Sequence, residues 1–158
     1  MPAELLKALL DARFFQSGMQ TLRQLEFALF DLSIHRANPA LNAAQVQATL
    51  NEIREKYAVL PTTDYNRFQH SFSHIFAGGY AAGYYSYKWA EVLASDAFDR
   101  FEDEGIFNTT TGKQFRENIL AVGGKDTALD AFINFRGREP KIDALLRHQG
   151  WTNPSKNA

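Results

Sequence analysis

The chain has 158 residues, of which 45% are hydrophobic and 22% charged, and its formal net charge is −1. This composition indicates a folded globular protein with one ordinary core and excludes a disordered chain. Because Lys and Arg form no cluster larger than a pair, the sequence gives no sign of nucleic-acid binding. The absence of cysteine excludes disulfides, thiolate nucleophiles and cysteine zinc sites, and it favours a cytoplasmic location.

Apolar residues recur with the helical period along nearly the whole chain, and no stretch alternates as a strand does. We therefore expect an all-α fold. No linker or repeat divides residues 1–158, so we expect a single region, either one domain or one piece of a larger domain. No apolar stretch reaches the roughly 20 residues that span a bilayer, and the N-terminus does not resemble a signal peptide.

The first helix is expected over about Ala3–Phe14, and the second begins at a capping box, Ser17-Gly18-Met19-Gln20, and ends near His35. Apolar side chains surround most of the second helix, which indicates neighbours on several sides, including a partner outside this chain. They comprise a leucine stripe and three residues outside it: Leu22, Leu25, Leu29, Leu32, Phe27, Phe30 and Ile34.

The third helix is expected over Ala43–Tyr57, between a loop at Asn38-Pro39 and Asn42 and a break at Pro61-Thr62-Thr63-Asp64. Its buried side carries Val46, Leu50 and Ile53.

A long helix is expected from about Ala81 to Glu104, with Gly105 as its left-handed cap. A second capping box, Thr111-Gly112-Lys113-Gln114, begins a helix that ends at Val122, before Gly123-Gly124. Two further helices are expected over about Thr127–Phe135 and from Pro140, in the first turn, to near Gly150. The tail Trp151–Ala158 is expected to fray.

The run His74–Tyr87 contains three glycines, four tyrosines and one histidine. Glycines let the backbone approach a ligand or move as a hinge, and phenol and imidazole groups can hydrogen-bond to a substrate oxygen. The run therefore predicts a substrate-facing loop that leads into the long helix.

The four tyrosines have two interpretations. On a helix Tyr80, Tyr84 and Tyr87 share a narrow arc, whereas Tyr85 falls on a separate stripe with Trp89 and is the expected core tyrosine. Alternatively, all four are core or interface residues. The glycines weigh against this, because each weakens a helix by roughly 1 kcal/mol relative to alanine.

His74 is open to the same two interpretations, packing or catalysis. His74 also forms the only close histidine pair in the sequence, with His70. The pair lacks an obvious third ligand, and a spacing of four residues recurs by chance in helices. We place no metal site in this chain.

The segment His74–Trp89, HIFAGGYAAGYYSYKW, resembles the C-terminal part of the oligopeptidase A and thimet oligopeptidase family of zinc metallopeptidases, which also includes dipeptidyl carboxypeptidases. The resemblance extends to Leu22–Asp31 (LRQLEFALFD), Phe98–Phe107 (FDRFEDEGIF) and Phe135–Pro140 (FRGREP), and so covers nearly the whole chain.

The resemblance implies the multi-helix C-terminal part of a larger helical peptidase domain that hydrolyses short peptides. The family holds zinc on an HExxH helix, with the glutamate as general base. This sequence contains no HExxH. The implied zinc is therefore bound by residues outside this chain, in the missing upstream part of the peptidase, and we expect this chain alone to be inactive.

Matched by position, Tyr87 and His74 are the implied catalytic residues, with Tyr87 as the oxyanion donor. Tyr80 and His74 would position substrate carbonyls. The remaining residues implied to bind or support the substrate site are Gly78, Gly79, Tyr84 and Tyr85. The segment FRGREP has two interpretations. It contacts the substrate, or, at least as well supported, it is a helix stop with a surface salt bridge from Arg136 or Arg138 to Glu139. The alternative for the whole chain is a free-standing, non-catalytic helical module that binds peptides or a protein partner.

Overall fold

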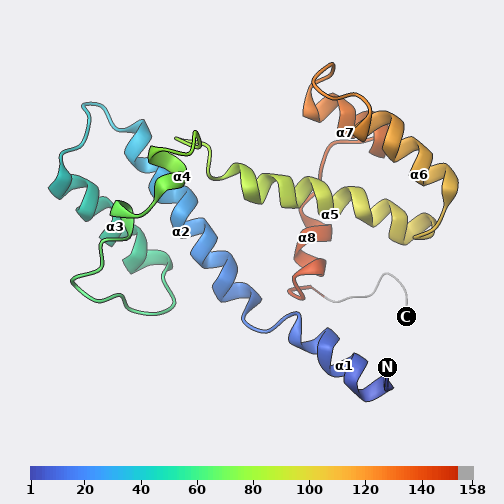
Figure 1. Ribbon diagram of the computed structural model, residues 1–158, viewed down its shortest axis with the longest axis horizontal. Helices are drawn as coiled ribbons and strands as arrows, with labels where there is room; N and C mark the ends of the chain where they lie inside the picture. The colour runs from blue at the N-terminus through green and yellow to red at the C-terminus, as the bar shows by residue number, and fades with distance from the viewer. Residues whose placement is uncertain (153–158) are drawn as a thin grey trace. The chain divides into compact units, whose positions relative to one another are not determined.

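The computed structural model describes residues 1–152, and every regular element in that part of the chain is a helix (Figure 1). The predicted all-α fold is therefore confirmed. The chain divides into two compact units, the first from Met1 to Lys88 and the second from Trp89 onward, and each has its own hydrophobic core. Residues 153–158 of the predicted frayed tail lie outside the described residues.

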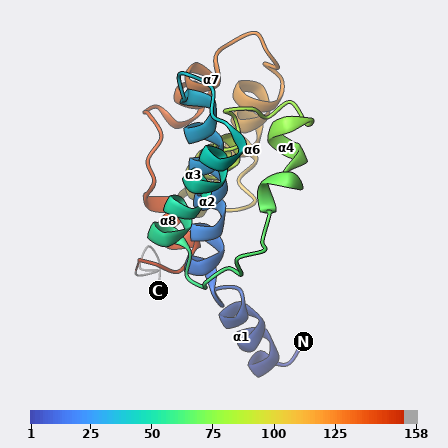
Figure 2. The same ribbon diagram turned by 90° about the vertical axis from the view of Figure 1, so that its left-hand side faces the viewer.

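The first unit contains four helices and one 3-10 turn before the start of the long helix that follows. They are α1 (Ala3–Ala12), α2 (Ser17–Arg36), α3 (Ala43–Tyr57), η1 (Phe68–His70) and α4 (Ser73–Phe76). Figures 1 and 2 show α3 lying alongside α2. The predicted bounds of α2 and α3 agree with the structure to within one residue.

The capping box predicted at the start of α2 is wrong. Gln16, with a left-handed φ of 56°, occupies the N-cap position, so Ser17 is already inside the helix. A capping box lies instead at α3, where the Asn42 side chain accepts the Gln45 N–H at 3.0 Å and the Gln45 side chain accepts the Asn42 N–H at 2.9 Å. Asn is among the preferred N-cap residues, although the sequence assigned Asn42 only to a loop.

The core of the first unit consists of Phe30, Leu50, Phe72 and Ile75, all buried. Of the three residues predicted for the buried side of α3, Leu50 belongs to this core, and Val46 and Ile53 pack against it. The phenylalanines of α2 face this core, whereas the predicted leucine stripe is half-buried or exposed. The same helix buries two carboxylates, Glu26 and Asp31.

The second unit begins within the long helix. Its elements are α5 (Ser86–Glu104), α6 (Thr109–Phe115), the π-helical turn η2 (Arg116–Leu120), α7 (Ala128–Arg136) and α8 (Asp143–His148). Gly105 ends α5 with a φ of 105°, as predicted. The second predicted capping box is wrong, because Asn108 caps α6 by accepting the N–H groups of Thr110 and Thr111. Pro140 precedes α8 and does not lie in its first turn.

Ala97, Phe132 and Phe135 form the buried core of the second unit. Beside it lies a network of ion pairs that begins in the FRGREP segment. The predicted pairing with the Glu139 carboxylate is wrong: Arg138 pairs with Asp96 at 2.6 Å, and Arg136 pairs with both Asp96, at 3.0 Å, and Asp99, at 2.9 Å. The predicted helix stop is present at Gly137, which has a φ of 74°.

Candidate functional site

The glycine- and tyrosine-rich segment lies entirely in the first unit, between α4 and the start of α5. The long helix was predicted to begin near Ala81, but α5 begins at Ser86. Residues 81–85 form turns instead, and Ala82 has a left-handed φ of 54°. Because an L-residue does not continue a right-handed helix from that conformation, the helix starts only after the turns.

Four of the predicted site residues form one aromatic cluster. His74, on α4, has its ring 6.2 Å from that of Tyr80, 5.8 Å from that of Tyr84 and 6.4 Å from that of Tyr87, centroid to centroid. Tyr80 and Tyr87 are stacked at 5.3 Å, and Tyr84 meets Tyr87 edge-on at 5.2 Å. Three phenol rings and one imidazole are thus gathered from residues that span the whole predicted loop.

Tyr84, and not Tyr85, is the core tyrosine. The Tyr84 ring packs against Phe72 at 5.1 Å, and its hydroxyl donates to Gln24 Oε1 at 2.9 Å. Burial raises the pKa of Tyr84, and nearby Arg23 partly offsets this. Tyr85 is 49% exposed. The prediction failed because it assumed a continuous helix through residues that form turns.

Tyr80 and Tyr87 lie at the surface of the cluster, 39% and 41% exposed. A hydrogen bond with the Tyr80 side chain raises the pKa of Tyr87, as do loss of hydration and the neighbouring Tyr84. A tyrosine whose pKa lies above its ordinary value of about 10 keeps its proton at neutral pH, so Tyr87 can donate a hydrogen bond to an approaching ligand.

Gly78 and Gly79 connect α4 to Tyr80, and the backbone requires glycine at both. A Cβ at Gly78 would lie 2.9 Å from the main-chain oxygen of His74, and Gly79 has a φ of +78°. The pair therefore allows a tight return of the chain, in which Tyr80 N–H donates to the His74 carbonyl at 3.0 Å.

Asp31 is a polar residue of this region that the sequence analysis missed. It lies on α2, is fully buried, and accepts hydrogen bonds from the N–H groups of Ala82, at 2.8 Å, and Tyr84, at 2.9 Å. The sequence offers only a weak signal for it: an acidic residue that directly follows buried Phe30 on a largely apolar helix. Burial of a carboxylate requires such partners.

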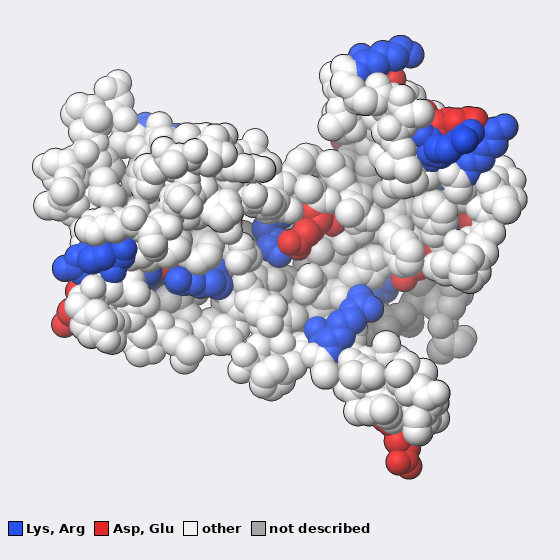
Figure 3. Space-filling model, in the orientation of Figure 1, with Lys and Arg blue, Asp and Glu red and all other residues white. Residues whose placement is uncertain are grey.

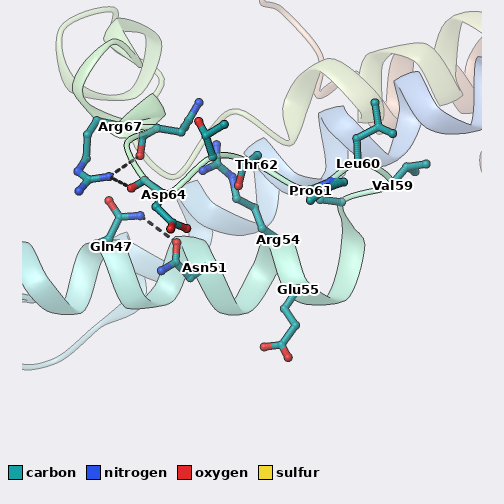
Figure 4. Close-up of a pocket in the computed structure, with 13 residues that line it drawn as sticks. Gln47, Asn51, Arg54, Glu55, Val59, Leu60, Pro61, Thr62, Asp64 and Arg67 are labelled. Carbon is teal, nitrogen blue, oxygen red and sulfur yellow. Dashed lines mark hydrogen bonds between the residues drawn. The ribbon is translucent and has the colours of Figure 1, made fainter.

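A separate pocket of about 640 Å³ lies between α3 and residues 58–67 (Figure 4). Some of its polar groups bind one another, whereas one buried guanidinium nitrogen of Arg54 has no hydrogen-bond partner among the described residues. Gln47 donates to Asn51 at 2.9 Å, and Arg67 donates to the main-chain oxygen of Asp64 at 2.7 Å. The lining residues, all between Gln47 and Arg67, do not include the tyrosine cluster, which remains the candidate functional site.

On the face drawn in Figure 3, basic and acidic side chains occur in small separate groups among uncharged residues. That face therefore has no broad basic surface of the kind that binds a phosphate backbone. Within residues 1–152, each helix is too short or too polar to cross a lipid bilayer.

Comparison with known proteins places the chain in a family. The family model for peptidase family M3 matches residues 1–151. The chain belongs to peptidase family M3. It is 54% identical over 150 residues to oligopeptidase A of Escherichia coli (strain K12), an alignment that covers 95% of this chain and 22% of that protein.

More distant family M3 relatives give the same coverage. The organellar oligopeptidase A of Arabidopsis thaliana, described as chloroplastic/mitochondrial, is 48% identical over 162 residues, covering 100% of this chain and 20% of the relative. Dipeptidyl carboxypeptidase of Escherichia coli (strain K12) is 35% identical over 156 residues, covering 95% and 22%. The chain thus spans about a fifth of the length of these curated relatives. The predicted resemblance to the oligopeptidase A family is confirmed.

The zinc that the resemblance implies for family M3 does not fit the residues of this chain. Among the described residues, no group of three or more His, Asp or Glu side chains is arranged to hold a metal ion. His70 lies in η1 and His74 in α4, where the His74 ring belongs to the tyrosine cluster.

Proposed function

We propose that this chain supplies the substrate-binding and transition-state-stabilising residues of a zinc oligopeptidase that hydrolyses short peptides in the cytoplasm. The observation that supports the proposal most directly is the cluster of His74, Tyr80, Tyr84 and Tyr87. Its hydroxyl and imidazole groups are able to donate hydrogen bonds, and family M3 membership supports peptide hydrolysis as the reaction that they serve.

In this proposal Tyr87 donates its hydroxyl proton in a hydrogen bond to the negative oxygen that develops on the scissile carbonyl. Stabilisation of this kind acts where charge appears in the transition state, and it works best from a donor that is already in place. A tyrosine with its ordinary pKa of about 10 is already protonated at neutral pH, and the pKa of Tyr87 is shifted further upward.

Tyr80 and His74 hold neighbouring substrate carbonyls, while Gly78 and Gly79 let the loop approach the peptide closely. Tyr84 supports the cluster from the side of the core, because its ring packs on Phe72 and its hydroxyl is already bonded to Gln24.

In this proposal the zinc of the complete peptidase is held by an HExxH motif outside this chain, since this sequence contains no HExxH. The other partner of the chain is accordingly the remainder of the peptidase, and we expect neither nucleic acid nor membrane as a partner. The chain alone should cleave no peptide above background at any zinc concentration.

Cleavage of an internally quenched peptide tests the proposal in three samples. These are the chain alone, the chain mixed with the rest of Escherichia coli oligopeptidase A, and a chimera in which residues 1–151 replace the matching segment of that enzyme. We expect activity in the chimera and none in the chain alone. A folded, zinc-loaded chimera without activity would contradict the proposal, and activity of the chain alone would reveal a metal site within it.

The alternative is a free-standing helical module that binds peptides or a protein partner without catalysis. The exposed apolar residues of α1, a helix with no buried residue, would serve as its partner surface, although a missing remainder of the peptidase accounts for them equally. Fluorescence anisotropy of a labelled peptide with the isolated chain separates the two. Tight binding that survives both Tyr80→Phe and Tyr87→Phe would favour the module.

A further inference from the structure

One buried carboxylate holds the turn in the middle of the tyrosine cluster. The Asp31 side chain is 0% exposed; its Oδ1 accepts the Ala82 N–H at 2.8 Å, and its Oδ2 accepts the Tyr84 N–H at 2.9 Å. His35, one turn along α2, places Nδ1 2.8 Å from the main-chain oxygen of Asp31 and 2.8 Å from Oδ1. Both carboxylate oxygens are therefore engaged, and two of their three partners are main-chain groups of the loop.

The turn that Asp31 holds is one that the chain would not adopt readily by itself. Ala82 has a φ of 54°, a left-handed conformation that is strained for an alanine. Main-chain N–H groups close to a left-handed residue converge on one point and bind an anion there. The Asp31 carboxylate occupies that point, and charge-assisted hydrogen bonds to it offset the strain.

The position of this turn connects Asp31 to the proposed reaction. Tyr80 precedes the turn, Tyr84 is bonded within it through its own N–H, and Tyr87 lies in the first turn of α5, which begins at Ser86. The place where the turn ends sets the rotation at which α5 starts, and so the direction in which Tyr87 points. On the other side of Tyr80, the loop is held by main-chain hydrogen bonds alone, among them the Tyr80 N–H to the His74 carbonyl at 3.0 Å.

We infer that Asp31 is a positioning residue for the tyrosine cluster. It fixes the turn between Tyr80 and Tyr87, and in doing so fixes the geometry of the oxyanion donor. The inference rests on the function proposed above for the cluster. Asp31 itself is fully buried and reaches the substrate only through the main chain that it holds.

Asp31→Asn tests this in the chimera with Escherichia coli oligopeptidase A. The amide keeps the shape of the side chain but offers one oxygen where two N–H groups need an acceptor. Because small displacements of catalytic groups are costly, we expect kcat to fall by about 10- to 100-fold. KM should change little and zinc content should not change, since the loss concerns the transition state.

Glu26→Gln is the matched control. Glu26 is the other buried carboxylate of α2, but it pairs with Arg54 and Arg23 at 2.8 Å and is not bonded to the loop. We expect it to lower the melting temperature without lowering kcat. If the two variants lose kcat equally at matched stability, Asp31 is only a core residue and the inference fails.

Adding Ala82→Gly to Asp31→Asn provides a rescue test, because glycine adopts the left-handed turn without strain. We expect the double variant to recover part of the lost kcat, which a purely structural loss in the core would not allow. Should Asp31→Asn alone fail to fold, the double variant carries the comparison with Glu26→Gln. No recovery in a folded double variant would contradict the inference.

Hydrogen exchange of the chimera separates failure of this inference from failure of the proposed function. In Asp31→Asn the amides of residues 80–88 should exchange faster, while those around Phe30 keep their protection. Unchanged exchange at residues 80–88 would overturn the positioning role. Faster exchange with an unchanged kcat would leave Asp31 as the holder of the turn and would remove the cluster from catalysis.

Discussion

At the scale of single residues, the Tyr87 hydroxyl carries the most specific prediction. Its hydrogen bond with Tyr80, its lost hydration and its neighbour Tyr84 raise its pKa, so it stays protonated and able to donate. In the chimera, Tyr87→Phe should lower kcat about 10²- to 10³-fold, the usual loss for one oxyanion donor. Steady-state kinetics with a parallel zinc determination measures this, and zinc content should not change.

Tyr65→Phe makes the same chemical change at a tyrosine of the first unit that is 82% exposed. It should leave kcat at the parent value. A Tyr87→Phe variant that behaves like Tyr65→Phe would remove Tyr87 from the oxyanion role.

At the scale of elements, the helix caps could be predicted only in part. Asn108 accepts the N–H groups of Thr110 and Thr111 at 3.0 and 3.3 Å, but the sequence equally offers Thr111 as a cap. The structure instead buries Thr111, whose hydroxyl donates to Glu104 at the end of α5. A tertiary contact therefore decides between two locally acceptable caps.

Asn108→Ala should consequently destabilise the second unit by about 1 kcal/mol, the typical cost of removing an N-cap side chain. Asn108→Asp keeps the acceptor and loses only the Nδ2–H bond to the Glu104 main-chain oxygen, so it should cost less. Urea unfolding of both variants compares the two losses. Equal losses for Ala and Asp would indicate that the Asn108 side chain stabilises the fold in another way.

Local pattern was sufficient for α3, where a polar helix has a single apolar face and clear breaks at both ends. It was insufficient for the region before α5. Tyr80, Tyr84 and Tyr87 are spaced with the helical period, but Tyr80 and Tyr84 precede the helix. Asp31, about fifty residues earlier, holds the turn that delays the start of α5 to Ser86. The sequence thus singled out four residues that the structure gathers into one cluster, and it missed Asp31, because a contact so distant in the chain leaves no local signal.

At the scale of the whole molecule, the ion pairs of the second unit make its stability depend on pH. Burial raises the pKa of Asp96, but hydrogen bonds from Arg138 and from Lys141 N–H outweigh it, so the net pKa lies below 3.8. For Glu102, hydrogen bonds from His148 and Arg147 likewise outweigh burial and hold the pKa below 4.5. Both carboxyls therefore bind protons more weakly in the folded than in the unfolded state.

This difference in proton binding decides how the stability of the second unit changes with pH. Above the unfolded pKa values the stabilisation is fully present, and it is lost as the pH falls through them towards the lower folded values. The melting temperature should thus be flat near neutral pH and fall below about pH 5. Asp96→Asn should lower it at neutral pH and reduce its slope on the acid side. A slope that Asp96→Asn leaves unchanged would assign the acid sensitivity to other groups.

The exposed apolar surface of α1 leads to a prediction about the free chain. Four leucines lie on one side of α1 and are each about half exposed: Leu5, Leu6, Leu9 and Leu10. Phe15, just beyond the helix, is 70% exposed. Contiguous apolar surface of this kind drives association in water. We therefore expect the isolated chain to self-associate with rising concentration in sedimentation velocity, and Leu6→Lys with Leu10→Lys to shift it towards the monomer. Ala8→Lys adds one lysine on the other side of α1 and should leave association unchanged, whereas each of the single variants Leu6→Lys and Leu10→Lys should weaken it. A chain that stays monomeric at all concentrations would contradict the prediction.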